Sequence, residues 1–406
     1  MNRLNRTNYL NWLLRWKDQQ IIKVVSGVRR CGKSTLFEIY RDYLLANGVS
    51  PEQIHAINFE DLEFEDLLDY RALYAYIQKR LLPDQLNYIF LDEIQHVSHY
   101  EKAVDSLFLK QNCDVYITGS NAYFMSGELA TLLTGRYVEL KMMPLSFKEF
   151  YDNLPESKQS LSLNEKLNWY LTTGSFPYVL KYGYGEREAR EYMSGIYNTI
   201  LLNDVVRRLK ISDINMLETV TRFLMHNIGN RTSPSTIANT MTSNHKKIDS
   251  KTVDRYLRGL TDSLLFYEVR RYNIKGKQFL TTMNKYYVCD LAMRNLLVRG
   301  KDSDIGHLLE NLVYLELKRR YPEVYVGQLG SDGEVDFVVL ENGTPIYFQV
   351  AQTTLDDHVL QRELAPLRAI SDNYPKYLLT LDEAFGKVNY NGIQKENALK
   401  WMLEIE

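Results

Sequence analysis

Residues 21–36 read IIKVVSGVRRCGKSTL, and this stretch decides the fold expected for the first part of the chain. Residues 27–34 fit the pattern GxxxxGK[ST], whose glycines let backbone amides wrap around phosphate groups at a helix N-terminus. The apolar run before the pattern predicts a strand, and the residues after it predict a helix. We therefore predict a phosphate-binding loop between a strand and a helix.

The chemistry of the loop predicts ATP and Mg²⁺ as its ligands. Lys33 can reach the β- and γ-phosphates, and the hydroxyl of Ser34 can ligate magnesium. Arg29 and Arg30 raise the positive charge near the phosphates, although a surface or domain-contact role is equally open. The predicted nucleotide-binding residues are Gly27, Val28, Arg29, Arg30, Cys31, Gly32, Lys33, Ser34, Thr35 and Asp92.

An acidic pair follows a second apolar run, at residues 88–93, which read YIFLDE. Four apolar residues and two acids predict a buried strand that ends at its carboxyl edge, where ligands of open parallel sheets collect. We expect Asp92 to hold magnesium together with Ser34. We expect Glu93 to act as the general base that activates the attacking water.

Two further polar positions are candidates for the same site. The apolar strand near 115–118 ends in Thr118-Gly119-Ser120-Asn121, and a side chain there would lie beside the γ-phosphate. We favour Asn121, with Ser120 next, while ordinary turn chemistry explains these residues equally well. Arg136 could stabilise the transition state from its own chain or from a neighbouring subunit, and a solvated surface arginine is the open alternative.

The rest of the first 150 residues alternates apolar runs with amphipathic segments, which predicts βα units and a parallel sheet. Residues 151–225 are typical of a helical lid or linker, broken at 174–177, where the sequence is GSFP. The expected fold class is therefore α/β, with a P-loop parallel sheet at 1–150 followed by further modules.

Residues 226–300 predict a winged-helix-like module. Ser233-Pro234 is typical of a helix start, and Val253, Tyr256, Leu257 and Leu260 share one face of a second helix, ahead of a hairpin. Residues 227–285 hold eleven Lys and Arg against four acids, a net charge of +7, while the whole chain carries −2. Contact with a DNA backbone and contact with other protein domains both remain open.

Residues 301–406 resemble the PD-(D/E)XK nuclease scaffold, with Glu310 on a helix and Glu334 and Asp336 at the start of a strand. Nuclease chemistry needs a second carboxylate and a lysine on the next strand. Gln349 and Ala351 occupy those positions, so we expect an α/β module without nuclease activity. A nuclease stays as the disfavoured alternative.

Several motifs together resemble a known family, the AAA-type (AAA+) ATPases of bacteria and archaea that carry a C-terminal domain of unknown function 4143. The residues that carry this resemblance are IKVVSGVRRCGKSTL at 22–36, INFED at 57–61, IFLDEIQ at 89–95, ITGSNA at 117–122, GRYVELKMMPLSFKEF at 135–150 and GSFPYVL at 174–180. The resemblance implies a catalytic glutamate on the strand next to the phosphate-loop strand. It also implies Asn121 or Ser120 as a sensor residue and Arg136 as an arginine-finger candidate.

Bulk composition fits this interpretation. With 45% hydrophobic and 25% charged residues, the chain has a globular composition. We find no apolar run long enough for a membrane helix, no signal-peptide pattern and no disulfide or metal spacing among the three cysteines, so we expect a cytoplasmic protein. The first hypothesis is an ATP hydrolase that reorients its appended domains, and the second is a nucleotide-dependent switch with little turnover. A homo-oligomer is compatible with either, and the sequence names no protein partner.

Overall fold

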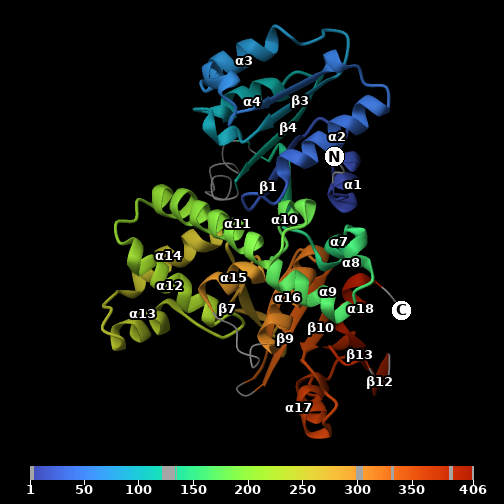
Figure 1. Ribbon diagram of the computed structural model, residues 1–406, viewed down its shortest axis with the longest axis vertical. Helices are drawn as coiled ribbons and strands as arrows, with labels where there is room; N and C mark the ends of the chain where they lie inside the picture. Colours follow the sequence, from blue (N-terminus) through green and yellow to red (C-terminus); the bar gives the residue numbers. More distant parts are fainter. Residues whose placement is uncertain are drawn as a thin grey trace.

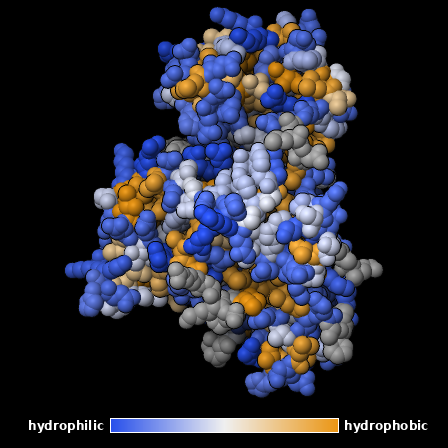
Figure 2. All heavy atoms as spheres, viewed as in Figure 1, coloured by the Kyte–Doolittle hydropathy of each residue, from blue (hydrophilic) through white to orange (hydrophobic). Residues whose placement is uncertain are grey.

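The structure is a computed structural model, and it describes residues 4–120, 133, 135–298, 305–330, 333–383 and 387–404. The N-terminal sheet and its helices form an upper lobe, and the remaining elements form a larger lower body (Figure 1). On the face shown in Figure 2, apolar side chains are scattered among hydrophilic ones. Among the described helices, none combines the length and the apolar character that crossing a membrane requires.

The upper lobe is built on a parallel sheet of five strands, as the alternating pattern predicted. The strands are β1 (Ile22–Gly27), β2 (Ile54–Asn58), β3 (Asn87–Asp92), β4 (Cys113–Ser120) and β5 (Tyr137–Met142). The helices of this lobe are α1 (Thr7–Arg15), α2 (Lys33–Ala46), α3 (Tyr70–Gln78) and α4 (Tyr100–Phe108). The central strands β1, β3 and β4 are buried along their whole length, because helices cover both faces of the sheet.

The strand order corrects one expectation. The sheet runs β2-β3-β4-β1-β5, so β4 separates the phosphate-loop strand β1 from β3, which carries the acidic pair. Ile117 in β4 is in register with Val24 on one side and with Leu91 on the other. The expected placement of Glu93 on the strand next to β1 is therefore wrong. The connections between parallel strands are long enough to allow either order, so local pattern could not decide it.

A helical segment follows the sheet in the chain. Its elements are α7 (Phe147–Asp152), α8 (Glu156–Gln159), α9 (Leu163–Thr173), α10 (Pro177–Tyr182), α11 (Glu186–Thr199), the π-helical segment η4 (Ile200–Arg207) and α12 (Ile214–His226). The predicted break is confirmed, since α9 ends at Thr173 and α10 begins at Pro177. Gly174 has φ 92°, a left-handed backbone conformation that favours glycine.

The predicted helix pair and hairpin are present after α12. They are α13 (Pro234–Ser243), α14 (Ser250–Asp262), β6 (Phe266–Asn273) and β7 (Gln278–Val288), followed by α15 (Leu291–Leu297). Ser233 caps α13 by accepting from the N–H of Thr236, as the Ser-Pro signal predicted. The hairpin does not stand apart as a free wing, because β6 pairs in parallel with β8 of the C-terminal region.

The C-terminal region completes one sheet of eight strands with that hairpin, in the order β12-β13-β11-β10-β9-β8-β6-β7. Its elements are α16 (Ile305–Arg320), β8 (Val324–Leu329), β9 (Gly333–Glu341), β10 (Thr344–Val350), α17 (Asp357–Arg368), β11 (Lys376–Thr380), β12 (Val388–Tyr390), β13 (Ile393–Asn397) and α18 (Ala398–Leu403). The boundary proposed near residue 300 thus separates elements that share a sheet. The winged-helix and nuclease-like assignments stay predictions.

Candidate active site

The phosphate loop joins the carboxyl end of β1 to the start of α2, which begins at Lys33. Gly32 caps the helix with φ 105°, a conformation that side chains disfavour. A Cβ atom on Gly27 would collide with the carbonyl oxygen of Met142 and lie 2.9 Å from Sγ of Cys31. Both glycines are therefore required by the backbone, and the loop leaves its amides at a helix N-terminus where anions bind.

Arg6, near the N-terminus, donates a hydrogen bond to the backbone of the phosphate loop. Arg6 is 5% exposed, and its guanidinium donates to the carbonyl oxygens of Cys31 at 3.0 Å and Met143 at 2.8 Å. Its Nε donates to Glu149 at 2.7 Å. Sequence reasoning missed Arg6, because an arginine in a polar N-terminal stretch carries no signal that distinguishes it from a solvated one.

Lys33 and Glu93 face each other in the buried interior of the site. The ammonium of Lys33 lies 3.5 Å from Oε1 of Glu93 and 3.4 Å from the carbonyl oxygen of Gly27. Burial opposes the charge of Lys33, but the carboxylates of Glu93 and Asp92 outweigh it and raise the pKa of Lys33. Burial likewise opposes the charge of Glu93, and Lys33 and a hydrogen bond from Gln95 lower the pKa of Glu93.

Thr118 on β4 connects the two acids of β3. Its hydroxyl donates to Oδ1 of Asp92 and accepts from the N–H of Glu93 at 2.9 Å. Burial raises the pKa of Asp92, against hydrogen bonds from Thr118 and Ser34 that lower it. Ser34 is therefore within hydrogen-bonding reach of Asp92, as a shared magnesium site requires.

The role of the predicted sensor residues stays a prediction. Sequence reasoning favoured Asn121, which lies outside the described residues, and Ser120. Ser120 is buried, and its hydroxyl has no hydrogen-bond partner among the residues that the structure describes. Sequence reasoning did not select Thr118, because the sequence alone does not show which polar residue at the end of this strand faces the acidic pair. That depends on the strand order.

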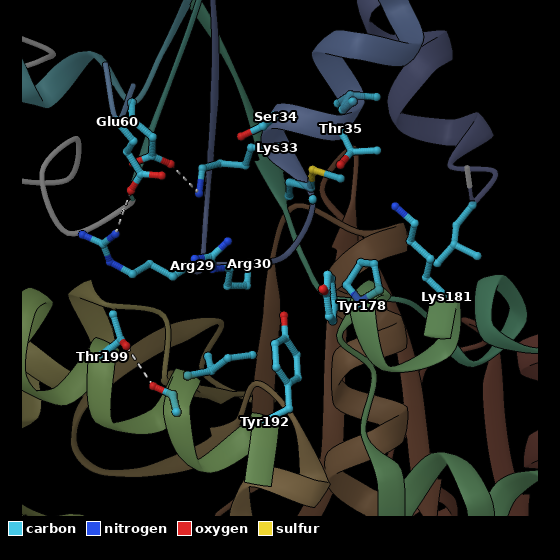
Figure 3. A pocket seen from close by; sticks show the side chains of 18 of the residues that line it. Arg29, Arg30, Lys33, Ser34, Thr35, Glu60, Tyr178, Lys181, Tyr192 and Thr199 are labelled. Atoms are coloured by element: carbon cyan, nitrogen blue, oxygen red, sulfur yellow. Dashed lines mark hydrogen bonds and ion pairs between the residues drawn. The ribbon is translucent and has the colours of Figure 1, made fainter. Parts of the chain in front are cut away.

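A cavity of about 830 Å³ opens beside these groups, between the loop and the helices α10 and α11. Figure 3 shows Lys33, Ser34 and Arg29 reaching into it from the loop, and Tyr178 and Tyr192 from the helices opposite. One end of the cavity carries the charged groups Arg29, Glu60 and Glu93. The apolar residues that line the cavity are Leu4, Leu36, Ile39, Met142, Pro177 and Ile196.

The structure brings most of the predicted nucleotide-binding residues to this cavity. Arg29, Arg30, Gly32, Lys33, Ser34 and Thr35 line it. Val28 and Cys31 are buried beneath the loop. Glu60 and His96, which sequence reasoning did not select, each bring a ligand atom within 4.8 Å of Glu93. Within the described ranges, no other set of three or more His, Cys, Asp and Glu side chains meets this spacing.

Arg136 is not brought to the cavity. Its carbonyl accepts from the N–H of Ile22 at the start of β1, whereas the loop begins at the other end of that strand. Five residues at about 3.3 Å each separate these two ends by roughly 16 Å. The guanidinium instead lies 3.9 Å from Asp105 and over the ring of Phe108. A role at the site of a neighbouring subunit stays a prediction.

The acids of the predicted nuclease-like module form ion pairs with a lysine of the β6–β7 hairpin and with an arginine that precedes α13. The ammonium of Lys285 on β7 lies 2.8 Å from both Glu310 and Glu334, and Arg231 also pairs with Glu334. Gln349 donates to Glu363 at 2.9 Å rather than facing an open site. Part of the basic excess of residues 227–285 thus pairs with acids of the C-terminal region.

Comparison with known proteins supports the AAA-type fold of the upper lobe. A family model described as an AAA domain matches residues 19–151, and a domain of unknown function (DUF8612) matches residues 164–304. An uncharacterized protein of Haemophilus influenzae is 38% identical over 99% of both chains. An uncharacterized protein of Methanocaldococcus jannaschii is 30% identical over 94% of this chain and 88% of its own. The structure of a Walker-type ATPase of Pyrococcus abyssi superposes with a TM-score of 0.50 at 15% identity, covering 72% of this chain and 95% of that one.

Proposed function

This chain belongs to the same family as the uncharacterized Haemophilus influenzae protein and carries an AAA domain at residues 19–151, and from that premise we propose that it binds ATP with Mg²⁺ and hydrolyses it. One observation carries the proposal. A buried ammonium at the start of α2 faces a buried carboxylate at the end of β3 across a single cavity, with Lys33 Nζ 3.5 Å from Glu93 Oε1. Such a pair suits a triphosphate and the water that attacks it.

The charged and the apolar residues that line the cavity suggest how the nucleotide is oriented in it. The triphosphate belongs at the N-terminus of α2, with its terminal phosphate toward Glu93 and Glu60. The base belongs against the apolar lining residues Leu36, Ile39 and Pro177, because apolar walls favour a purine ring. This orientation uses the segment 174–180 as one wall of the base pocket.

The residues of the site then have distinct tasks. Ser34 and Asp92 would hold the magnesium ion, which supplies positive charge to the β- and γ-phosphates. Lys33 exchanges its contact with Glu93 for phosphate oxygens. Glu93 is then free to accept a proton from water as the water oxygen bonds to the γ-phosphorus and the bond to the β,γ-bridging oxygen breaks, which leaves ADP and phosphate.

Two substitutions test this assignment. Lys33→Ala should abolish ATP binding in titration calorimetry, whereas Lys79→Ala, at an exposed helix end, should bind like the wild type. Glu93→Gln should bind Mg²⁺-ATP but lose steady-state phosphate release, whereas the exposed Glu63→Gln should turn over normally. Wild-type turnover by Glu93→Gln would remove the role given to that residue.

We further propose that the nucleotide state is transmitted to the lower body. Asp290, which follows β7, accepts from the N–H and the hydroxyl of Ser175 at 2.6 and 2.5 Å. Ser175 lies two residues before Pro177, the first residue of α10 and one of those that line the cavity. This contact supports both an ATPase that reorients its domains and a switch with little turnover, which a turnover measurement separates.

DNA is a second candidate partner. It is favoured by the exposed cations of residues 227–285 that do not pair with the acids of the C-terminal region. Several exposed Lys and Arg side chains lie in the turn before α14 and on that helix. They are Lys246, Lys247, Lys251, Arg255 and Arg258. Such a strip suits a phosphate backbone. Affinity for duplex DNA should fall steeply as salt rises, and the absence of any affinity at low salt would eliminate this partner.

A further inference from the structure

Arg29 projects from the phosphate loop and crosses to the helical segment η4. Its Nε donates to both carboxylate oxygens of Asp204, at 2.9 and 3.0 Å. Asp204 is 2% exposed, and Arg29 is the cation that pairs with it among the described residues. The loop and the segment η4 are therefore joined by an ion pair between two residues 175 positions apart in sequence.

The guanidinium of Arg29 also lies at the end of the cavity where the terminal phosphate is expected. Its Nη1 is 3.8 Å from Oε1 of Glu60. Glu60 in turn has a carboxylate oxygen within 4.8 Å of one on Glu93, and Oε1 of Glu93 lies 3.5 Å from the ammonium of Lys33. Figure 3 shows Arg29 beside Glu60, on the same side of the cavity as Lys33.

We propose that Arg29 binds the terminal phosphate of ATP within its own chain, and that Asp204 is the positioning residue that aims it. A guanidinium has five N–H donors in one plane, and Asp204 engages the one on Nε. The donors on Nη1 and Nη2 are left for phosphate oxygens, which outcompete the long contact with Glu60. The inference rests on the proposed nucleotide site, and it supplies in cis the charge that Arg136 is placed too far away to give.

Through the same ion pair, the third phosphate of ATP would act on the segment η4. The segment η4 continues directly from α11, whose Tyr192 and Thr199 line the cavity. A π-helical turn in a helix frequently marks a functional site. ADP lacks the group that Arg29 would bind, so of the two nucleotides only ATP would contact Arg29, and through its existing ion pair with Asp204 only ATP would act on this segment.

The first test compares a non-hydrolysable ATP analogue with ADP, both with Mg²⁺, in titration calorimetry. Arg29→Ala should weaken binding of the analogue by about tenfold or more and leave ADP affinity nearly unchanged, while kcat falls by about a hundredfold. The matched control is Arg208→Ala, which breaks an ion pair of 2.5 Å to Asp262 near the same segment but outside the cavity. The control should change neither affinity nor kcat.

The second test asks whether Asp204 acts through Arg29. Asp204→Asn should lower kcat in the wild-type background and have no further effect in Arg29→Ala, because coupled residues give non-additive losses. Arg29→Lys, which keeps the charge without the planar fork, should retain part of the analogue affinity and serves if Arg29→Ala unfolds.

Three outcomes divide the possibilities. Additive losses would overturn the positioning role of Asp204. Equal weakening of the analogue and of ADP by Arg29→Ala would overturn the terminal-phosphate contact while leaving the nucleotide site in place. A wild-type chain that binds neither nucleotide would instead remove the proposed function itself.

Discussion

Replacing Thr118 by valine removes one hydroxyl from the centre of the site and keeps the shape of the side chain. The hydroxyl donates to the Asp92 carboxylate and accepts from the buried N–H of Glu93. Losing a hydrogen bond to a charged group costs about 1.5–3 kcal/mol, and a buried N–H without a partner costs about 1–3 kcal/mol. We therefore expect the free energy of unfolding to fall by about 3 kcal/mol or more, a large share of the stability of an ordinary domain.

Urea unfolding measures this loss against a matched control. Thr221→Val also removes a buried hydroxyl, but that hydroxyl donates to Leu217 O at 2.8 Å within its own helix, so its loss should cost less than about 1 kcal/mol. Thr118→Val should also lower kcat, because Asp92 and Glu93 lose a common anchor, whereas Thr221→Val should not. Equal losses of stability in the two variants, with unchanged turnover in both, would refute the anchoring role.

Three other substitutions or conditions test separate parts of the structure. Gly27→Ala should abolish nucleotide binding in calorimetry, because the added Cβ collides with Met142 O, and normal binding would contradict the loop geometry. Lys285→Met should lower the free energy of unfolding by about 3–5 kcal/mol, since it leaves Glu310 and Glu334 without their shared cation, and an unchanged melting temperature would contradict that contact. Burial opposes the charge of Asp382, but hydrogen bonds from Thr353, Lys395 and Thr354 lower its pKa to about 2. A depressed carboxyl pKa gives stability above its ordinary value of 3.8 that is lost as pH falls toward 2, so acid unfolding of Asp382→Asn should lack this component.

The sequence predicted the parts of the site that depend on local pattern. The phosphate loop and the acidic pair each lie where a mostly apolar strand ends, so residue type and spacing were enough to place Lys33, Ser34, Asp92 and Glu93 at one edge of a sheet. The helix break at Gly174 was predictable for the same reason, because Gly-Ser-Phe-Pro restricts the backbone wherever it occurs.

The rest depends on contacts between residues far apart in sequence. The position of β4 between β1 and β3 decides that Thr118 anchors the acids, and no local pattern fixes that order. Arg6, Arg29 and Asp204 are ordinary charged residues until folding brings them to the cavity. The hairpin β6–β7 looked like a free wing because its pairing with β8 spans more than fifty residues.

A crystal structure of the Glu93→Gln variant grown with Mg²⁺-ATP would show whether the cavity holds the nucleotide. We expect a triphosphate held by the amides of residues 27–34 and by Lys33, a metal ion between Ser34 and Asp92, and the base against the wall formed by Leu36 and Pro177. An empty cavity at saturating nucleotide, or ATP bound elsewhere on the chain, would contradict this expectation.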